Sequence, residues 1–178
     1  MELTVLGGSA ATPNPGDASA GYLVRSGATT VLLDCGSGVV AKLRAHAEER
    51  ALSGVVISHL HSDHTLDLVA LRYALKYAPH PDGPPAAPVP LHLPPGGLDF
   101  LARLGAVFQQ GSEVGQDFWG EVFAPREYTP HLDGGPPLVI GALSIRFAAM
   151  RHYVPTWAVR LEEGGTGRVL TYSADTGP

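Results

Sequence analysis

Short apolar runs separated by turn-forming residues occupy most of the chain. Runs rich in β-branched and aromatic residues predict strands, and Ser26-Gly27 supplies a turn that pairs two of them as an antiparallel hairpin. Apolar residues at helical spacing predict amphipathic helices. The expected strands lie at 3–6, 21–25, 29–33, 54–57, 91–93, 121–128, 138–140, 143–149, 156–161 and 169–172. The expected helices run from the N-cap Ser37 to Ala47, from about Thr65 to near Pro79, and over 94–105.

The segment from Pro79 to Pro90 differs in composition from the rest of the chain. It is rich in proline, glycine and alanine and offers little that can pack, so we expect a surface loop. The succession of strands, helices and further strands favours a layered α+β or α/β fold in which helices cover a sheet sandwich. The length suits one core, and nothing marks a second one. We therefore expect a single domain over residues 1–178.

Composition and charge narrow the functional classes. No apolar run approaches the roughly 20 residues that cross a bilayer, and the N-terminus lacks the basic start of a signal peptide. We expect a cytoplasmic protein without a membrane partner. The single cysteine, Cys35, excludes an intramolecular disulfide, and its apolar flanks indicate burial. The net charge of −5 and the lack of Lys/Arg runs count against strong nucleic-acid binding.

The segment 57–64 carries the strongest chemical signal. It places three imidazoles and one carboxylate within six positions, between a buried strand and a helix. In an extended stretch residues i and i+2 point the same way, so His59 and His61 can hold one ion, while Asp63 and His64 turn toward a second. Imidazole nitrogen and carboxylate oxygen are zinc ligands. Burying these groups without partners would cost several kcal/mol, so we predict a metal site.

The sequence H-L-H-S-D-H at 59–64 resembles the H-x-H-x-D-H signature of the metallo-β-lactamase superfamily. The segment 33–36 is similar to the family's D-x-G, and 151–152 and 173–176 are similar to its later metal motifs, so the resemblance covers essentially the whole chain. It implies the αββα sandwich of that family. The implied ligands are His59, His61 and His152 for the first metal, Asp63 and His64 for the second, and Asp175 as a bridge between both.

The resemblance also implies a cofactor and a mechanism. It implies two divalent metal ions, which we expect to be zinc, although manganese and iron accept the same ligands. It implies hydrolysis by a metal-bound hydroxide, with Asp63 orienting the water and shuttling its proton. Asp34 is expected to accept a hydrogen bond from an amide of the ligand loop rather than bind metal. Cys35 is a poor nucleophile candidate.

Simpler interpretations remain open for several of these residues. Taken alone, His152 fits an ordinary strand-end histidine, and Asp175 fits the cap of a turn. Trp119 and Trp157 fit the core better than a pocket lining. Four other histidines match no metal motif, and we assign them no function: His46, His80, His92 and His131.

Within the family, the Gly7-Gly8-Ser9 loop and the segments 34–36 and 173–176 are closest to the ribonuclease Z and phosphodiesterase-like branch. True β-lactamases, many of which use a cysteine at the second metal, are less similar. The chain lacks a basic, glycine-rich arm for gripping tRNA, so a small or nucleotide phosphodiester is favoured over tRNA as the substrate.

Two alternatives stay open. One is a thioester or lactone hydrolase of the glyoxalase II type, where a bridging Asp also follows the third motif. The other is a catalytically incomplete metal-binding domain, because the family pattern continues beyond the bridging Asp to a further α/β unit and a last histidine, whereas this chain stops at Pro178. We therefore expect the C-terminal strands and helix to be missing and the second metal to bind more weakly. The sequence leaves a homodimer open.

Overall fold

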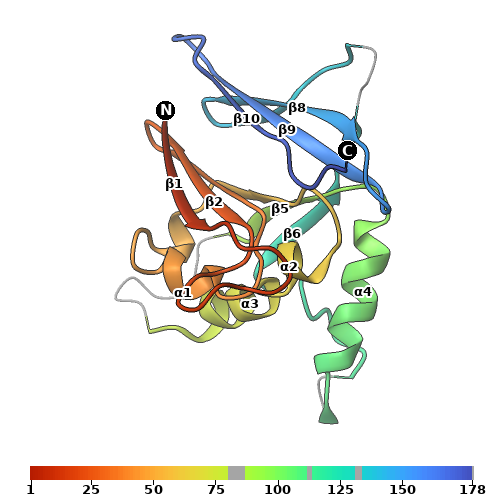
Figure 1. Cartoon of the computed structure of the whole chain (residues 1–178). Helices are drawn as coiled ribbons and strands as arrows, with labels where there is room; N and C mark the ends of the chain where they lie inside the picture. Colours follow the sequence, from red (N-terminus) through yellow and green to blue (C-terminus); the bar gives the residue numbers. More distant parts are fainter. Residues whose placement is uncertain (80–86, 112–113, 131–133, 178) are drawn as a thin grey trace.

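A computed structural model describes residues 1–79, 87–111, 114–130 and 134–177 of the chain (Figure 1). The strands are β1 (Glu2–Gly7), β2 (Gly21–Ser26), β3 (Thr29–Leu33), β4 (Gly54–Val56), β5 (Val89–Leu93), β6 (Phe123–Glu127), β7 (Leu138–Ile140), β8 (Leu143–Met150), β9 (Thr156–Glu163) and β10 (Val169–Tyr172). The helices are α1 (Val39–Leu43), the 3₁₀ turn η1 (Glu49–Ala51), α2 (Ser62–Thr65), α3 (Leu68–Tyr77) and α4 (Gly97–Phe108).

The strands form two sheets that face each other (Figure 1). The larger sheet has the order β1-β2-β3-β4-β5-β6, and the smaller has the order β10-β9-β8-β7. The first three strands pair antiparallel, with a tight turn between β2 and β3 and a longer loop between β1 and β2, whereas β3, β4, β5 and β6 pair parallel. Parallel neighbours require long crossovers, and these crossovers supply α1, α3 and α4. The smaller sheet is antiparallel throughout.

Two apolar clusters hold the layers together. Strand β3 serves both, because successive side chains point to opposite faces of a sheet. Leu32 packs toward the helices with Leu71 of α3, while Val31 and Leu33 pack toward the smaller sheet with Phe147 of β8. This double burial agrees with the predicted mixed α/β sandwich. In the described part of the chain, helices cover the larger sheet and none covers the outer face of the smaller one.

A polar bridge also joins the two sheets. The carboxylate of Glu163 on β9 accepts a 2.6 Å hydrogen bond from the hydroxyl of Ser26 on β2. It also pairs with the N-terminal ammonium at 2.7 Å. The N-terminal ammonium, Ser26 and Thr166 together lower the pKa of the Glu163 carboxyl to about 2. The Glu163 carboxyl is therefore ionised at neutral pH.

Helix boundaries differ from the sequence-based expectations. The first helix ends at Leu43 rather than Ala47, and its N-cap is Gly38, with φ 86°, rather than Ser37. The helix expected from about Thr65 begins at Leu68 as α3, and a separate short helix, α2, precedes it, with the break at Asp67. The Asp67 amide donates to the Cys35 carbonyl at 3.0 Å, and its carboxylate accepts from the Val40 amide at 2.9 Å. These long-range bonds fix a break that helical periodicity does not encode.

The segment around the third helix shows a similar shift. Residues 94–97 form a turn closed by a 2.9 Å bond from the Gly97 amide to the Pro94 carbonyl, so α4 starts three residues later than expected. Strand β5 starts two residues earlier, at Val89. It tolerates Pro90 because its ladder with β4 begins only at Leu91. The expected loop between Pro79 and Pro90 falls mostly outside the described residues, as do His80 and His131.

None of the helices described is long and apolar enough to cross a bilayer.

Candidate metal centre

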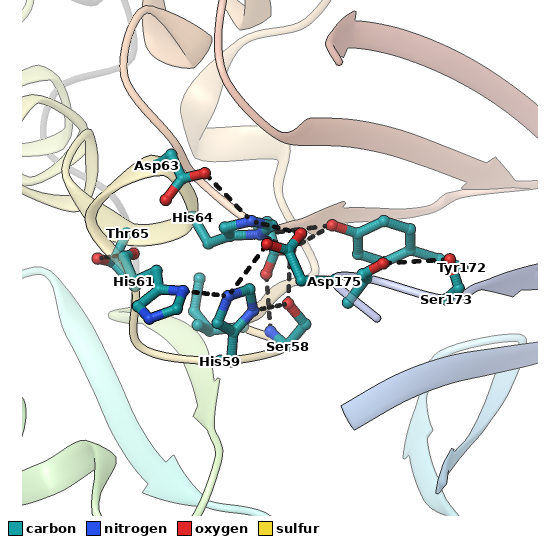
Figure 2. A network of polar contacts seen from close by, with 12 residues as sticks. Ser58, His59, His61, Asp63, His64, Thr65, Tyr172, Ser173 and Asp175 are labelled. Carbon is teal, nitrogen blue, oxygen red and sulfur yellow. Dashed lines mark hydrogen bonds and ion pairs between the residues drawn. The ribbon is translucent and has the colours of Figure 1, made fainter. Parts of the chain in front are cut away.

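The predicted ligands lie in three segments of the chain, and Figure 2 shows Asp175 facing the ligands of the segment that follows β4. His59 and His61 follow β4, and His64 lies in α2 immediately after them. His152 precedes β9, and Asp175 follows β10. Strands of the two sheets therefore end at the same edge of the sandwich, and this brings residues from both halves of the chain together.

Three histidines and Asp175 form the first group of possible ligands. The Nδ1 atom of His61 lies 3.0 Å from Nε2 of His59 and 3.3 Å from Nε2 of His152. Four ligand atoms arranged tetrahedrally at about 2.0–2.1 Å from zinc lie about 3.3 Å from one another. Asp175 Oδ2 is slightly farther, at 3.7 Å from His152 Nε2 and 4.0 Å from His59 Nε2. The donor set and its spacing fit a tetrahedral metal.

Asp63, His64 and Asp175 form the second group. His64 Nε2 lies 3.3 Å from Asp175 Oδ1 and 3.6 Å from Asp63 Oδ2. Asp175 thus offers one carboxylate oxygen to each group, as the bridging role predicted for it requires. All six predicted ligands fall into these two groups, and both groups fit a metal by donor chemistry.

Burial prepares the first group for a cation. Burial, followed by the charge of His64, lowers the pKa of His59 from 6.5 to about 4. Burial and the neighbouring His152 also lower the pKa of His61. Both imidazoles are therefore neutral at pH 7, and a neutral imidazole keeps the lone pair that binds a metal.

Asp34 accepts hydrogen bonds from residues of the ligand loops and from Tyr172. Its side chain is fully buried, and its Oδ1 accepts a 2.7 Å bond from the Ser58 amide in the ligand loop, as the sequence predicted. Its Oδ2 accepts from the Ser58 hydroxyl at 2.7 Å, from His64 Nδ1 at 2.7 Å and from the Tyr172 hydroxyl at 2.8 Å. Because an ionised carboxylate only accepts, His64 Nδ1 must carry a proton, which leaves Nε2 facing Asp63 and Asp175.

The protonation of His64 follows from the same contacts. Burial disfavours its charged form, but the hydrogen bond and charge of Asp34, together with Asp175 and Asp63, outweigh burial and raise the pKa of His64 above 6.5. A cation bound in this group would replace the proton on His64 Nε2, because it would lie beside the same carboxylates of Asp63 and Asp175.

Hydrogen bonds to backbone carbonyls hold the ligand loops in place. The Tyr128 hydroxyl donates to the Ile57 carbonyl at 3.0 Å, and the Trp157 amide donates to the Ser58 carbonyl at 3.3 Å. The Gly177 amide donates to the Arg151 carbonyl at 2.6 Å, which links the loop of Asp175 to that of His152. Sequence reasoning missed Tyr128 entirely. It also missed Tyr172, although Tyr172 directly precedes the 173–176 motif.

Residues without an assigned role stay outside the two groups. Cys35 is fully buried, and burial is the main cause that raises the pKa of its thiol, which agrees with its exclusion as a nucleophile. Trp119 is a core residue whose Nε1 donates to the Leu101 carbonyl at 2.7 Å. His92 is buried on β5, and burial followed by the charge of Arg126 lowers its pKa to about 4.

Gly36 gives the D-x-G segment a packing role. A Cβ atom at this position would overlap the carbonyl of Asp63 and press on the Cβ of Ser19. We expect Gly36→Ala to push α2 away, to cost at least about 2 kcal/mol of stability and to weaken metal binding. Urea denaturation and zinc titration measure both effects. Gly8→Ala is the matched control, because its nearest atom would be the Tyr22 hydroxyl at 4.0 Å. Wild-type metal affinity in Gly36→Ala would contradict this packing role.

Comparison with known proteins agrees with the geometry. The model of the β-lactamase superfamily domain matches residues 29–178, most of the chain. The chain belongs to the metallo-β-lactamase superfamily. A crystal structure of the metallo-β-lactamase fold protein YhfI from Bacillus subtilis superposes on this family member with a TM-score of 0.78 at 26% identity, covering 97% of this chain and 62% of that one. Human tRNase Z, short form, shares the fold with a TM-score of 0.73 at 20% identity, covering 98% of this chain and 69% of that one.

Curated relatives of this superfamily member include metallo-hydrolases. The probable metallo-hydrolase YhfI of Bacillus subtilis is 29% identical over 99% of this chain and 64% of its own length. A ribonuclease Z of Mycobacterium bovis is 32% identical over 100% of this chain and 64% of its own length. An uncharacterised protein of Mycobacterium leprae is 35% identical over 99% of this chain and 58% of its own length. The chain thus spans about three fifths of these relatives.

Proposed function

We propose that this chain carries the catalytic centre of a metal-dependent phosphodiesterase. The observation that carries the proposal is the pair of ligand groups that share Asp175, one built from three histidines and the other from Asp63 and His64. When bound, two divalent ions would act as Lewis acids toward water and toward a phosphoryl oxygen. Zinc suits the nitrogen-rich first group best.

The residues around this centre have separable tasks. His59, His61 and His152 would hold one ion as neutral imidazoles, and His64 would bind the other through Nε2 because Asp34 fixes the proton on Nδ1. The Asp63 carboxylate would accept the proton of the attacking water. Attack forms a bond from the water oxygen to phosphorus and breaks the bond to the leaving alkoxide, which takes up the proton that Asp63 accepted.

The similarity to ribonuclease Z supports a phosphodiester substrate rather than a β-lactam. So does the donor set of the second group, which consists of two carboxylates and an imidazole with no thiolate. The net charge of −5 favours a small or nucleotide diester over a long polyanion such as tRNA.

The test is metal analysis followed by a substrate panel. The purified chain, and any longer form that its gene encodes, are loaded with zinc or manganese and assayed on bis(p-nitrophenyl) phosphate, a glutathione thioester and a lactone. We expect up to two ions per chain and turnover of the diester alone. Thioester or lactone turnover without diester turnover would overturn the proposal in favour of a glyoxalase II-type activity. Bound metal without any turnover would instead indicate a non-catalytic metal-binding domain.

A further inference from the structure

Two cavities adjoin the metal centre, one beside each group of ligands. The larger, of about 400 Å³, is lined by Asp63, His64 and Asp175 and by Tyr22 and Tyr172. The smaller, of about 210 Å³, contacts His61 of the first group. A phosphodiester carries two substituents on phosphorus, and both need a place when the phosphoryl group lies at the metal ligands. The smaller cavity is therefore a candidate for one of these two arms.

The walls of the smaller cavity are almost wholly apolar. They come from three loops, those that follow β4 and β5 and the one that precedes β9, and His61 supplies their one polar side chain among the described residues. The lining residues are Leu60, His61, Pro94, Pro95, Val154 and Pro155. A sugar or a charged arm would leave its polar groups without side-chain partners here, at a cost of about 1–3 kcal/mol each. An apolar or aromatic arm carries no such penalty.

Tyr153 lies in the chain directly before Val154 and Pro155 of this wall. Its ring centroid is 4.7 Å from that of His61 and 4.3 Å from that of His152. The residue is nevertheless 83% exposed, the largest exposure among the large hydrophobic side chains described. The ring therefore contacts two predicted ligands while most of its surface remains available for stacking.

We propose that Tyr153 and the apolar cavity beside His61 form a subsite for a planar aromatic substituent of the substrate. This inference rests on the proposed function and assigns the chemical class of one arm of the diester. The aromatic group would stack on Tyr153 and enter between the proline walls, which are rigid because the ring of proline fixes φ. The phosphoryl group would then lie at His61 and His152.

Binding of small phosphonates tests the subsite without requiring turnover. Zinc-loaded protein is titrated calorimetrically with phenylphosphonate, methylphosphonate and thymidine monophosphate. We expect Tyr153→Ala to weaken phenylphosphonate binding about two- to tenfold and to leave methylphosphonate unchanged, because aromatic pairs contribute about 0.5–1.5 kcal/mol and 1.4 kcal/mol is tenfold. Tyr153→Phe should keep wild-type affinity. Tyr77→Ala, which removes another exposed tyrosine from α3, is the matched control.

The outcomes separate the two proposals. Selective loss of phenylphosphonate supports an aryl arm, and an equal loss of thymidine monophosphate extends the subsite to nucleobases. A second variant, Val154→Asp, places a charge in the cavity and should weaken the same ligands. If Tyr153→Ala weakens methylphosphonate equally, or Tyr153→Phe behaves like Tyr153→Ala, the subsite is overturned. Aryl-selective binding without diester turnover would keep the subsite and remove the phosphodiesterase proposal.

Discussion

Replacing Asp175 with asparagine is expected to abolish hydrolysis and to lower the metal content of the chain. Asn keeps the shape of the side chain but has one carboxylate oxygen fewer and no charge, so it cannot serve both ligand groups. Metal catalysis supplies several kcal/mol of transition-state stabilisation, so we expect the rate to fall by about a thousandfold or more. Initial rates on a diester and metal analysis by mass spectrometry provide the measurements.

The control for this variant is Asp99→Asn on α4. Asp99 is 75% exposed in its side chain and pairs with Arg103 one turn away, so its loss should change neither rate nor metal content. Asp175 is itself 41% exposed in its side chain, and unfolding in the presence of a chelator should change little in Asp175→Asn. If Asp175 merely caps a turn, the variant will retain its metal and its activity, and the bridging role will be wrong.

Substitutions of Asp34 are expected to separate folding from metal binding. Asp34→Ala removes the acceptor for the buried Ser58 amide and His64 Nδ1 and for the partly buried Tyr172 hydroxyl. Breaking a buried charged pair costs about 3–5 kcal/mol, and the backbone φ of 57° at this position adds strain for alanine. We expect this variant to unfold at much lower urea concentration than the wild type.

Asp34→Asn should fold but bind metal poorly. Asparagine tolerates the left-handed backbone better than most residues and can still accept from the Ser58 amide. Its amide group, however, would donate to His64 Nδ1 and move the imidazole proton to Nε2, the atom that faces Asp63 and Asp175. We expect zinc affinity to fall about 10- to 100-fold, as measured by competition with a chromophoric chelator.

Tyr172→Phe provides a graded comparison for Asp34. It removes one of the donors to Asp34 Oδ2 and keeps the ring contact with Tyr22, whose centroid lies 4.8 Å away. A loss of about 1 kcal/mol of stability and a small change in zinc affinity are expected.

Wild-type zinc affinity in Asp34→Asn would show that the carboxylate does not set the His64 tautomer.

The elements differ in how far local sequence decides them. Each expected strand is present with ends that differ by at most two residues, because alternation and β-branched residues depend on near neighbours. Helix limits were less accurate. The break at Asp67 depends on bonds to Cys35 and Val40, and the early end at Leu43 has no signal in the apolar spacing. Strand β5 begins before its expected start, because its pairing with β4 starts only at Leu91 and needs no amide hydrogen from Pro90.

The segment 59–64 by itself determined most of the candidate site. Four possible ligands lie within one short loop and helix turn, so their proximity follows from covalent geometry. The Asp34 bond to the ligand loop was also predictable, through a resemblance in the D-x-G segment. The tertiary structure decided the rest: His61 and His152 are 91 positions apart in sequence, and they meet only because both sheets end at the same edge. The support from Tyr128 and Tyr172 and the apolar cavity beside His61 have the same origin, since packing between distant segments creates them.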